Sequence, residues 1–198
     1  TDLQDQGLLP GVEPYSALGF EVENAGAAWD VGLMEGEGDT TVVDWVLVQL
    51  HEDNAAYTVV GRQAALLRSD GGVITPDGQD TISFHEPLAG RLVSVLHRNH
   101  LGVLCTGPLT GAGELIDFTR TDLPVFGSDA RMYRDGRMVL WPGDVSCDGE
   151  VKDTGRNNDR DPIVKVLGGT DLNEVATGYS PADVNMDGRV IYSGADND

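Results

Sequence analysis

Lysine is almost absent from this chain, since only Lys152 and Lys165 among its 198 residues carry an ammonium side chain. Arginine supplies most of the positive charge, and 33 acidic residues outweigh 13 basic ones to give a formal net charge of −20. Nucleic acids and anionic lipid surfaces bind proteins through clustered cationic side chains. The composition therefore excludes both as expected partners.

Long apolar runs are missing as well. No stretch approaches the roughly 20 apolar residues that a membrane helix requires, so we expect no membrane insertion. The chain starts at Thr1 without a methionine and lacks the charged, apolar and cleavage-site pattern of an export signal. We therefore expect any export signal to have been removed or to lie outside this chain.

Cysteine occurs only twice, as Cys105 and Cys147. In an oxidising compartment an even count permits one disulfide, which here would tie the main domain to the C-terminal part of the chain. Closing a loop of about 40 residues would stabilise the fold by ~4 kcal/mol on the chain-entropy model. The alternative is two separate thiols, one of them behaving as a small buried hydrophobe. The cysteine count alone leaves both open.

An internal repeat marks the C-terminal part. Asp144–Gly149 (DVSCDG) returns 39 positions later as Asp183–Gly188 (DVNMDG). Each copy has oxygen-bearing side chains at loop positions 1, 3 and 5 and a glycine at position 6. Calcium binds about six to eight oxygens, and in an EF-hand-like loop these positions supply them, with a backbone carbonyl from position 7. The alternative is a solvated turn rich in Asp, Asn and Gly, but two copies extended in the same way favour calcium.

The residue that closes each loop lies further on than in an ordinary EF-hand. Position 12, normally a bidentate carboxylate, is Gly155 in the first copy and Gly194 in the second. Both copies reach a carboxylate at position 16, which is Asp159 or Asp198. We therefore expect two Ca²⁺ sites. The candidate ligands, with Glu150 and Arg189 acting through their carbonyls, are Asp144, Ser146, Asp148, Glu150, Asn157, Asp159, Asp161, Asp183, Asn185, Asp187, Arg189, Asp196 and Asp198.

The segment after the first loop predicts a short helix over Asp161–Leu167, because an N-capping residue and Pro162 precede the apolar positions and Gly168 follows them. Position 8 is valine in both copies, and we expect Val151 and Val190 to pin their loops to a core. Residues 141–198 are therefore predicted to form a small EF-hand-like, dockerin-like domain, entered through the hinge at Trp141.

Residues 1–140 predict a mainly β domain. Residues 1–40 are expected to be irregular with one or two short strands, including a loop over Ala25–Asp39. Thr41–Leu50 is rich in β-branched and aromatic residues and predicts a strand buried on most of both sides. Short strands recur every 8 to 12 residues or so without a helical pattern between them, which indicates an antiparallel β-sandwich. The further strands are expected at Tyr57–Leu67, Val73–Ile74, Thr81–Phe84, Arg91–Arg98, Leu101–Thr106, Glu114–Phe118 and Arg137–Trp141.

The motif His97-Arg98-Asn99-His100 is the sharpest chemical candidate outside the repeat. On a strand, residues three apart point to opposite faces and cannot bind one metal ion, whereas on a turn they can. A structural role, with imidazoles hydrogen-bonded to loop backbone, is the favoured reading. His51 and His85 are isolated, and no nucleophile with a base and an orienting group stands out, so we expect no enzyme.

The order of strand, turn, Phe…Leu-Ala-Gly and strand resembles transthyretin-like and small immunoglobulin-like modules of bacterial surface proteins. The motifs Val43–Val46, Ala64–Gly71, His97–Val103 and Asn157–Ile163 together resemble the C-terminal region of large secreted proteins of Bacteroidota. In those proteins a β-rich module is followed by paired dockerin-like calcium repeats. The resemblance implies architecture and location more than activity. The chain departs from the pattern at both cysteines, which favours the disulfide.

These features predict a non-enzymatic structural or adhesive module of the cell surface, stabilised by calcium. Calcium loops of modest affinity suit an extracellular location, where calcium is abundant. A calcium-dependent carbohydrate-binding module is the alternative, for which Trp29, Trp45 and Trp141 are available. The chain ends where a second helix would begin, which would leave Val190 and Ile191 uncovered. We therefore expect other protein subunits, including copies of this chain with residues 1–40 as donor, as partners, and glycans as the other class.

Overall fold

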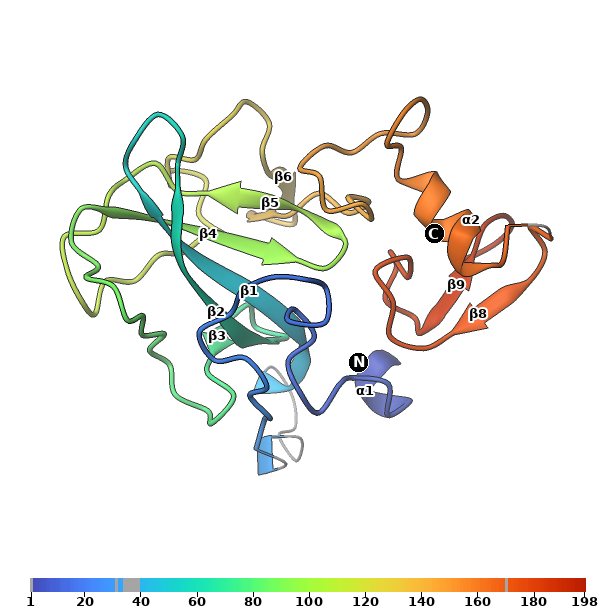
Figure 1. Ribbon diagram of the computed structural model, residues 1–198, viewed down its shortest axis with the longest axis horizontal. Helices are drawn as coiled ribbons and strands as arrows, with labels where there is room; N and C mark the ends of the chain where they lie inside the picture. Colours follow the sequence, from blue (N-terminus) through green and yellow to red (C-terminus); the bar gives the residue numbers. More distant parts are fainter. Residues whose placement is uncertain (1, 31, 34–39, 170) are drawn as a thin grey trace. The chain divides into compact units, whose positions relative to one another are not determined.

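The computed structural model describes residues 2–30, 32–33, 40–169 and 171–198. The chain forms two compact units (Figure 1). The sheet unit comprises Pro10–Leu96 and Gly102–Leu140, and the tail unit comprises Thr1–Leu9, His97–Leu101 and Trp141–Asp198. Of the predicted loop over Ala25–Asp39, residues 31 and 34–39 lie outside the described residues.

Five strands form the main sheet in the order β3-β2-β1-β4-β5. Pairing is antiparallel between β1 and β2, β1 and β4, and β2 and β3. The mainly antiparallel β-rich class predicted from the sequence is thereby confirmed. The strands are β1 (Val42–Glu52), β2 (Val59–Arg68), β3 (Val73–Ile74), β4 (Arg91–His97) and β5 (His100–Leu104).

Strand β1 lies at the centre of this sheet and is buried along most of its length, as its sequence predicts. Alternate residues point to opposite faces, so Trp45 and Leu47 lie on one face while Val46 and Val48 lie on the other. All four side chains are buried. Trp45 faces Leu66 across the β1–β2 pair. A strand with apolar side chains on both faces needs cover on both sides.

Residues before β1 are ordered against the sheet. Tyr15 donates its hydroxyl proton to the Trp45 carbonyl at 2.9 Å, and the Trp45 indole nitrogen donates to the Pro10 carbonyl at 2.9 Å. The Asn24 side chain exchanges hydrogen bonds with both backbone groups of Ala64. Residues 10–30 are thus irregular, as predicted, yet packed within the sheet unit.

The opposite face carries a cluster built on Val46, Val48, Leu50, Ala65, Val93 and Leu109. Side chains from irregular segments pack against it, among them Ile82, Phe84, Ile116 and Phe118. The strands expected at Thr81–Phe84 and Glu114–Phe118 are wrong, because these segments supply apolar side chains without forming a ladder. A second sheet facing the first, as in a sandwich, stays a prediction.

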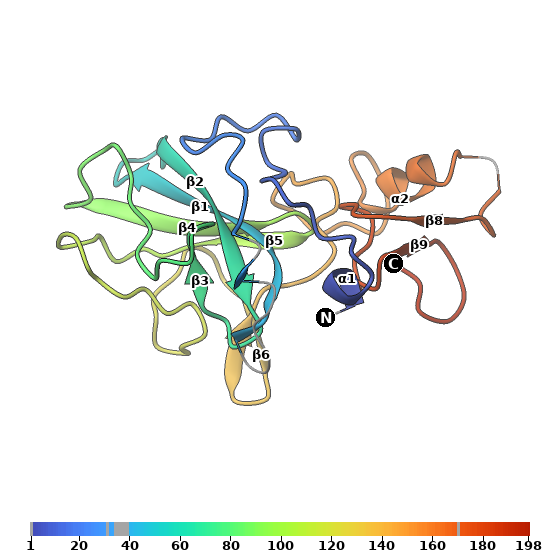
Figure 2. The ribbon, with the colours of Figure 1, turned by 90° about the horizontal axis from the view of Figure 1, so that it is seen from below.

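A short hairpin completes the described strands of the sheet unit. Strand β6 (Met132–Arg134) pairs antiparallel with β7 (Arg137–Val139), and Figure 2 labels β6 on this hairpin. Buried Arg131 precedes it and donates to the carbonyls of Phe118 and Leu123 at 2.7 and 2.8 Å. This arginine replaces ladder hydrogen bonds in holding the neighbouring irregular segment.

The tail unit has a small core of its own. Helix α2 (Arg160–Val166) packs against the hairpin of β8 (Val175–Thr177) and β9 (Arg189–Ile191), and Figure 2 shows these elements together. The four-residue helix α1 (Asp2–Asp5) also belongs to this unit. The core consists of Val145, Ile163, Leu167, Ala182 and Val190.

Helix α2 begins close to where the sequence predicts it. The Asn158 side-chain oxygen accepts from the backbone amides of Arg160 and Asp161 at 3.1 and 3.0 Å, so Asn158 satisfies the amides of the first turn. Asp159, the residue at the N-cap, makes no capping hydrogen bond with its side chain. Its carboxylate is engaged elsewhere, in the first loop.

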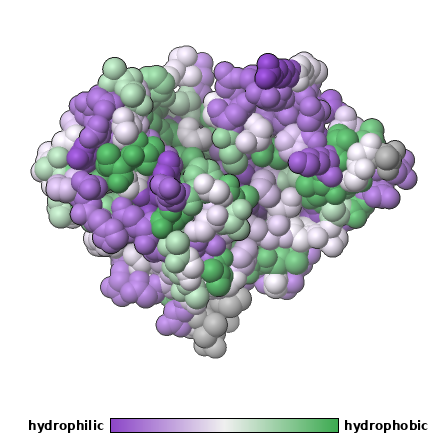
Figure 3. Space-filling model, viewed as in Figure 1, coloured by the Kyte–Doolittle hydropathy of each residue, from purple (hydrophilic) through white to green (hydrophobic). Residues whose placement is uncertain are grey.

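The surface mixes hydrophilic and hydrophobic residues. On the face shown in Figure 3, hydrophobic residues form several separate patches among hydrophilic ones. Leu115, Tyr133 and Phe126 are the most exposed large apolar side chains among the described residues. None of the helices in the described part of the chain has the length and apolar character needed to cross a bilayer.

Candidate metal centre

The two copies of the repeat, called here the first loop (144–159) and the second loop (183–198), share one hydrogen-bond scaffold. In the first loop Asp144 accepts from the amides of Asp148 and Gly149, one at each carboxylate oxygen, both at 3.1 Å. In the second loop Asp183 accepts from the amides of Asp187 and Gly188 at 3.1 and 3.0 Å. The position-1 carboxylate therefore folds each loop around itself.

The carboxylate at position 16 closes each loop in the same way. Asp159 accepts from the amides of Ser146 and Lys152 at 3.0 and 2.7 Å. Asp198 accepts from the amides of Asn185 and Ile191 at 3.3 and 2.8 Å. Each pair of partners is 39 positions apart, as are the two aspartates. The structure thus brings position 16 against positions 3 and 9 in both loops.

Backbone dihedrals repeat with the same period. Positions 4, 6, 12 and 14 have positive φ in both loops, and at position 6 the values are 82° for Gly149 and 83° for Gly188. Non-glycine residues adopt this conformation at a cost of about 1–2 kcal/mol each. Cys147 and Asn157 in the first loop, and Met186 and Asp196 in the second, do so here. Both loops therefore hold one specific, partly strained conformation.

Burial raises the pKa of both position-1 carboxylates. Desolvation raises the pKa of Asp144 above its ordinary value, against amide hydrogen bonds that lower it, and neighbouring Asp159 and Asp148 raise it further. Desolvation likewise raises the pKa of Asp183, whereas Arg98 opposes the shift. Negative charge is therefore costly at both positions unless a cation lies nearby.

Each loop has a cationic side chain of the protein beside its carboxylates. In the first loop the Lys152 ammonium pairs with Glu150 and lies 3.9 Å from Asp148. In the second loop the Arg98 guanidinium lies 3.9 Å from the Asp183 carboxylate, and neither side chain is exposed. These cations offset part of the acidic charge, and several carboxylates remain in each loop.

The sequence analysis missed the role of the turn between β4 and β5. Arg98 donates to the carbonyls of Ser180 and Asp183 and stacks on the Tyr179 ring with 4.5 Å to its centroid. Asn99 donates from its side chain to the Asp183 carbonyl at 2.5 Å, and its backbone carbonyl accepts from the Gly143 amide at 2.8 Å. A remote turn thus holds the entry to both loops, and its buried arginine could not be assigned a partner from the sequence.

Position 3 differs between the loops. The Ser146 hydroxyl is buried without a hydrogen-bond partner. Asn185 is exposed, accepts from the Asp187 amide at 3.0 Å and donates to the Asp196 carbonyl at 2.9 Å. A buried hydroxyl oxygen without a partner is costly, and a hard cation in the first loop would satisfy it.

The other candidate ligands are more exposed. Asp148 accepts from the Glu150 amide, and Asp187 accepts from the Arg189 amide, at 3.0 and 2.8 Å. The side chains at the remaining candidate positions lie at the surface; these are Glu150, Asn157, Asp161, Arg189 and Asp196. Since Glu150 and Arg189 are expected to act through their carbonyls, exposure of their side chains does not bear on that role.

Among the described residues, no group of three or more His, Cys, Asp or Glu side chains is positioned to hold a metal ion. In each loop, three aspartates accept from backbone amides, and the further oxygen donors belong to serine, asparagine or the backbone. A carboxylate oxygen has two lone pairs, so accepting one amide hydrogen leaves a lone pair for a cation. The oxygen-only donor set fits Ca²⁺ better than a transition metal.

Position 8 corrects two expectations, because Val151 was expected to pin the first loop to a core and Val190 was expected to lie uncovered. Val190 is 1% exposed and packs in the tail core, whereas Val151 is 50% exposed. The second loop forms β9 and meets α2, which covers Val190 without a second helix. On the same loop, the side chains of Gln6 and Leu8 lie so close that a Cβ at Gly188 would approach Leu8 to 2.6 Å. The expected exposed apolar side at Val190 is therefore wrong.

The two cysteines are free thiols in the structure, in contrast to the expected disulfide. Cys105 is buried, and its sulfur lies 3.7 Å from the Gly107 carbonyl. Cys147 is exposed as a residue, but its sulfur is partly buried against the Arg98 carbonyl at 3.3 Å. Each sulfur thus has a backbone carbonyl as its neighbour.

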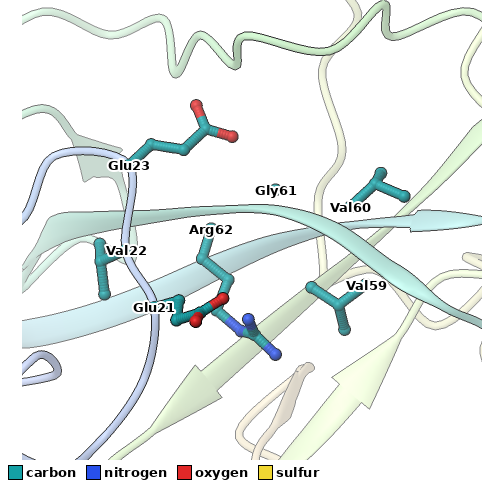
Figure 4. A pocket seen from close by; sticks show the side chains of 7 residues that line it. All are labelled: Glu21, Val22, Glu23, Val59, Val60, Gly61 and Arg62. Atoms are coloured by element: carbon teal, nitrogen blue, oxygen red, sulfur yellow. The ribbon is translucent and has the colours of Figure 1, made fainter.

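The sheet unit contains a hollow of about 260 Å³ lined by Glu21, Val22, Glu23, Val59, Val60, Gly61 and Arg62. Figure 4 shows the Glu23 side chain on one side of β2 and the side chains of Glu21 and Arg62 on the other. Glu23 is held by the Gln63 side chain and the His85 amide at 3.1 and 3.0 Å.

Comparison with protein-family models, with curated proteins and with solved structures found no match to this chain.

Proposed function

We propose that the tail unit binds two calcium ions, one in each loop, and that calcium stabilises an extracellular module without enzymatic activity. The observation that carries the proposal is the scaffold repeated at a spacing of 39 residues, in which aspartates at positions 1 and 16 bracket each loop; three of these four aspartates are buried and Asp198 is half-buried. The ligand set is Asp144, Ser146, Asp148, Asp159 and the Glu150 carbonyl in the first loop, and Asp183, Asn185, Asp187, Asp198 and the Arg189 carbonyl in the second.

The charge distribution supports a bound cation. Asp144 and Asp183 are 3% and 0% exposed, and a buried carboxylate is stable only when it is paired. Their amide hydrogen bonds stabilise the negative form, but neighbouring carboxylates repel it. Lys152 and Arg98 add one positive charge to each loop. A divalent ion would neutralise most of the remaining charge and satisfy the Ser146 hydroxyl.

Calorimetric titration of the chelator-stripped chain tests the proposal. We expect two equivalents of Ca²⁺, and we expect Asp159→Asn and Asp198→Asn each to remove one of them. Asp122→Asn is the matched control, because Asp122 is exposed and pairs with Arg120 outside both loops. Calcium should also protect the tail unit from proteolysis. Stoichiometry near zero, or two sites retained in both loop variants, would refute calcium binding.

The architecture proposed with this function is a β-sandwich-type domain followed by a dockerin-like tail. It corresponds to the resemblance with C-terminal regions of secreted Bacteroidota proteins, in which such a pair is a structural or adhesive module. A bound calcium ion at each loop would stiffen the tail unit, as extracellular calcium modules require. An extracellular location, where calcium is abundant, suits this proposed role.

Carbohydrate binding is the weaker alternative. Trp29 and Trp45 are 7% and 0% exposed, so they cannot form a stacking platform, and Trp141 at 37% would act alone. A glycan array with the calcium-loaded chain tests this function. Calcium-dependent binding to one glycan class, lost in Trp141→Ala, would favour it over a structural role.

Protein subunits, including copies of this chain, remain the proposed partners. The packing of Val190, Gln6 and Leu8 within the tail unit removes one reason for that proposal, because the second loop is covered by its own chain. Sedimentation of the chain with calcium and with chelator tests assembly. A monomer under both conditions would refute self-association.

A further inference from the structure

The two-residue turn between β4 and β5 brings two imidazoles together. His97 ends β4 and His100 begins β5, so they flank Arg98 and Asn99 (Figure 1). Their ring centroids are 4.7 Å apart with the planes at 80°, and the two Nδ1 atoms are 2.9 Å apart. Because His97 and His100 flank a turn, these two residues, three apart in the sequence, lie close enough to share a ligand.

The Asn99 side-chain oxygen is the third atom of this group. It lies 2.9 Å from His97 Nδ1 and 2.7 Å from His100 Nδ1. The amide orientation is determined by the neighbour on its other side, because Asn99 Nδ2 faces the Asp183 carbonyl at 2.5 Å and must donate to it. Asn99 therefore presents an acceptor to both imidazoles. His97 and Asn99 are 5% and 0% exposed, and His100 is half-buried.

No placement of protons makes all three contacts attractive. If both Nδ1 atoms carry hydrogen, both can donate to Asn99, but the two N–H groups then face each other. If one Nδ1 is unprotonated, it can accept from the other ring, but its lone pair then faces the Asn99 oxygen. If both are unprotonated, three lone pairs converge. One of the three short contacts is repulsive in every case.

A metal ion makes all three contacts favourable. Donor atoms on adjacent corners of an octahedron, with bonds of about 2.0–2.1 Å, lie about 2.9 Å apart. The three distances here, 2.9, 2.9 and 2.7 Å, approach that value. We propose that His97 Nδ1, His100 Nδ1 and Asn99 Oδ1 form one face of an octahedral site for a divalent transition-metal ion that prefers imidazole, such as Ni²⁺, Cu²⁺ or a Zn²⁺ ion that also holds water ligands.

This site is chemically separate from the two loops. Its nitrogen donors suit transition metals, whereas the loops offer oxygen donors that suit calcium. The two kinds of site meet at one residue, because Asn99 also holds the Asp183 carbonyl. Since two histidines and one amide make a small ligand set, the other coordination positions would be filled by water.

Titration of the full chain with Zn²⁺ in excess calcium tests the inference, because calcium then occupies oxygen sites. We expect one equivalent of Zn²⁺, and His100→Gln should weaken its binding by more than about tenfold. His85→Gln is the matched control, since the His85 side chain is 83% exposed and outside the turn. Cu²⁺ bound at the same site should show hyperfine coupling to two imidazole nitrogens in electron paramagnetic resonance.

Nitrogen NMR of the histidine side chains keeps the test decisive where a variant does not fold. In the native chain, Zn²⁺ should shift the Nδ1 resonances of His97 and His100 and leave those of His51 and His85 unchanged. Absence of stoichiometric Zn²⁺ binding, unchanged affinity in folded His100→Gln, or no Nδ1 shift at His97 and His100 would overturn the site. Zinc binding with these shifts but without calcium binding would leave this inference intact and refute the calcium proposal.

Discussion

Replacing Arg98 with methionine probes the charge balance of the second loop. The Arg98 and Asp183 side chains are both fully buried, with 3.9 Å between guanidinium and carboxylate. Arg98 also donates to the carbonyls of Ser180 and Asp183. Methionine has a similar length without charge, so the substitution removes the cation and its hydrogen bonds while keeping most of the packing volume.

The loss of stability caused by Arg98→Met should depend on calcium. Without calcium, the variant leaves the Asp183 carboxylate buried beside its acidic neighbours, and breaking a buried ion pair in this way costs about 3–5 kcal/mol. With calcium bound, the ion supplies positive charge, and the remaining loss is that of hydrogen bonds from a charged donor, about 1.5–3 kcal/mol. Calcium should therefore stabilise Arg98→Met by about 1.5–2 kcal/mol more than it stabilises the native chain.

Pulse proteolysis across a urea gradient, with fragments assigned to the tail unit by mass, measures this difference in calcium and in chelator. Arg131→Met is the matched control, because buried Arg131 donates to the carbonyls of Phe118, Arg120 and Leu123 in the sheet unit. Its cost should be the same in both conditions. An equal loss for Arg98→Met with and without calcium would show that no cation is bound near Asp183.

Three further predictions concern single side chains. Asp198→Asn should destabilise the second loop by about 1.5–3 kcal/mol in chelator, because a carboxylate oxygen that accepts from the Ile191 amide is lost. Asp196→Asn, the control, should change the stability little. Hydrogen exchange at the Ile191 amide measures both variants. Burial lowers the pKa of His51 below its ordinary value of 6.5, so the unfolded chain binds the proton more tightly and the stability of the fold should fall as the pH drops through 6.5. The urea midpoint of His51→Gln should therefore decline less between pH 7.5 and 5.5 than that of the native chain. Parallel slopes for the two chains would contradict this. Desolvation, with the Asp144 carboxylate adding to it, raises the pKa of the Cys147 thiol from 9.0 to about 11. Alkylation of Cys147 at pH 8 in chelator should therefore be about 100-fold slower than in urea, because the thiolate is the reacting form. Mass spectrometry gives the rates, and no alkylation without a reductant would indicate a disulfide.

Local sequence patterns predicted the local structure. The run of β-branched and aromatic residues in Thr41–Leu50 predicted the central strand, and Pro162 with Gly168 bracketed helix α2 to within a residue or two. Both depend on interactions between residues close in sequence. The segments Thr81–Phe84 and Glu114–Phe118 have the same composition as strands, but their side chains pack on the sheet without a ladder. Pattern alone cannot distinguish these two ways of burying an apolar side chain.

Contacts between residues far apart in the chain could not be predicted from the sequence. Arg98 and Asp183 are 85 positions apart, and nothing in either neighbourhood indicates that the guanidinium lies beside that carboxylate. Gln6 reaches the Asp187 carbonyl at 2.6 Å across 181 positions. Such contacts follow from how the chain folds back on itself. The buried polar residues of the β4–β5 turn were visible in the sequence, but their partners were not.

The two loops are equal in scaffold and unequal in surroundings. Their amide hydrogen bonds repeat residue for residue, yet Val151 is exposed where Val190 is buried, and a lysine from within the first loop occupies the role that remote Arg98 has in the second. A local lysine can leave with little cost, because its side chain is partly exposed. Moving the buried Arg98 side chain away from Asp183 would cost much more. The first loop should therefore depend more on calcium for its order, while the second is held by the turn between β4 and β5 even before an ion binds.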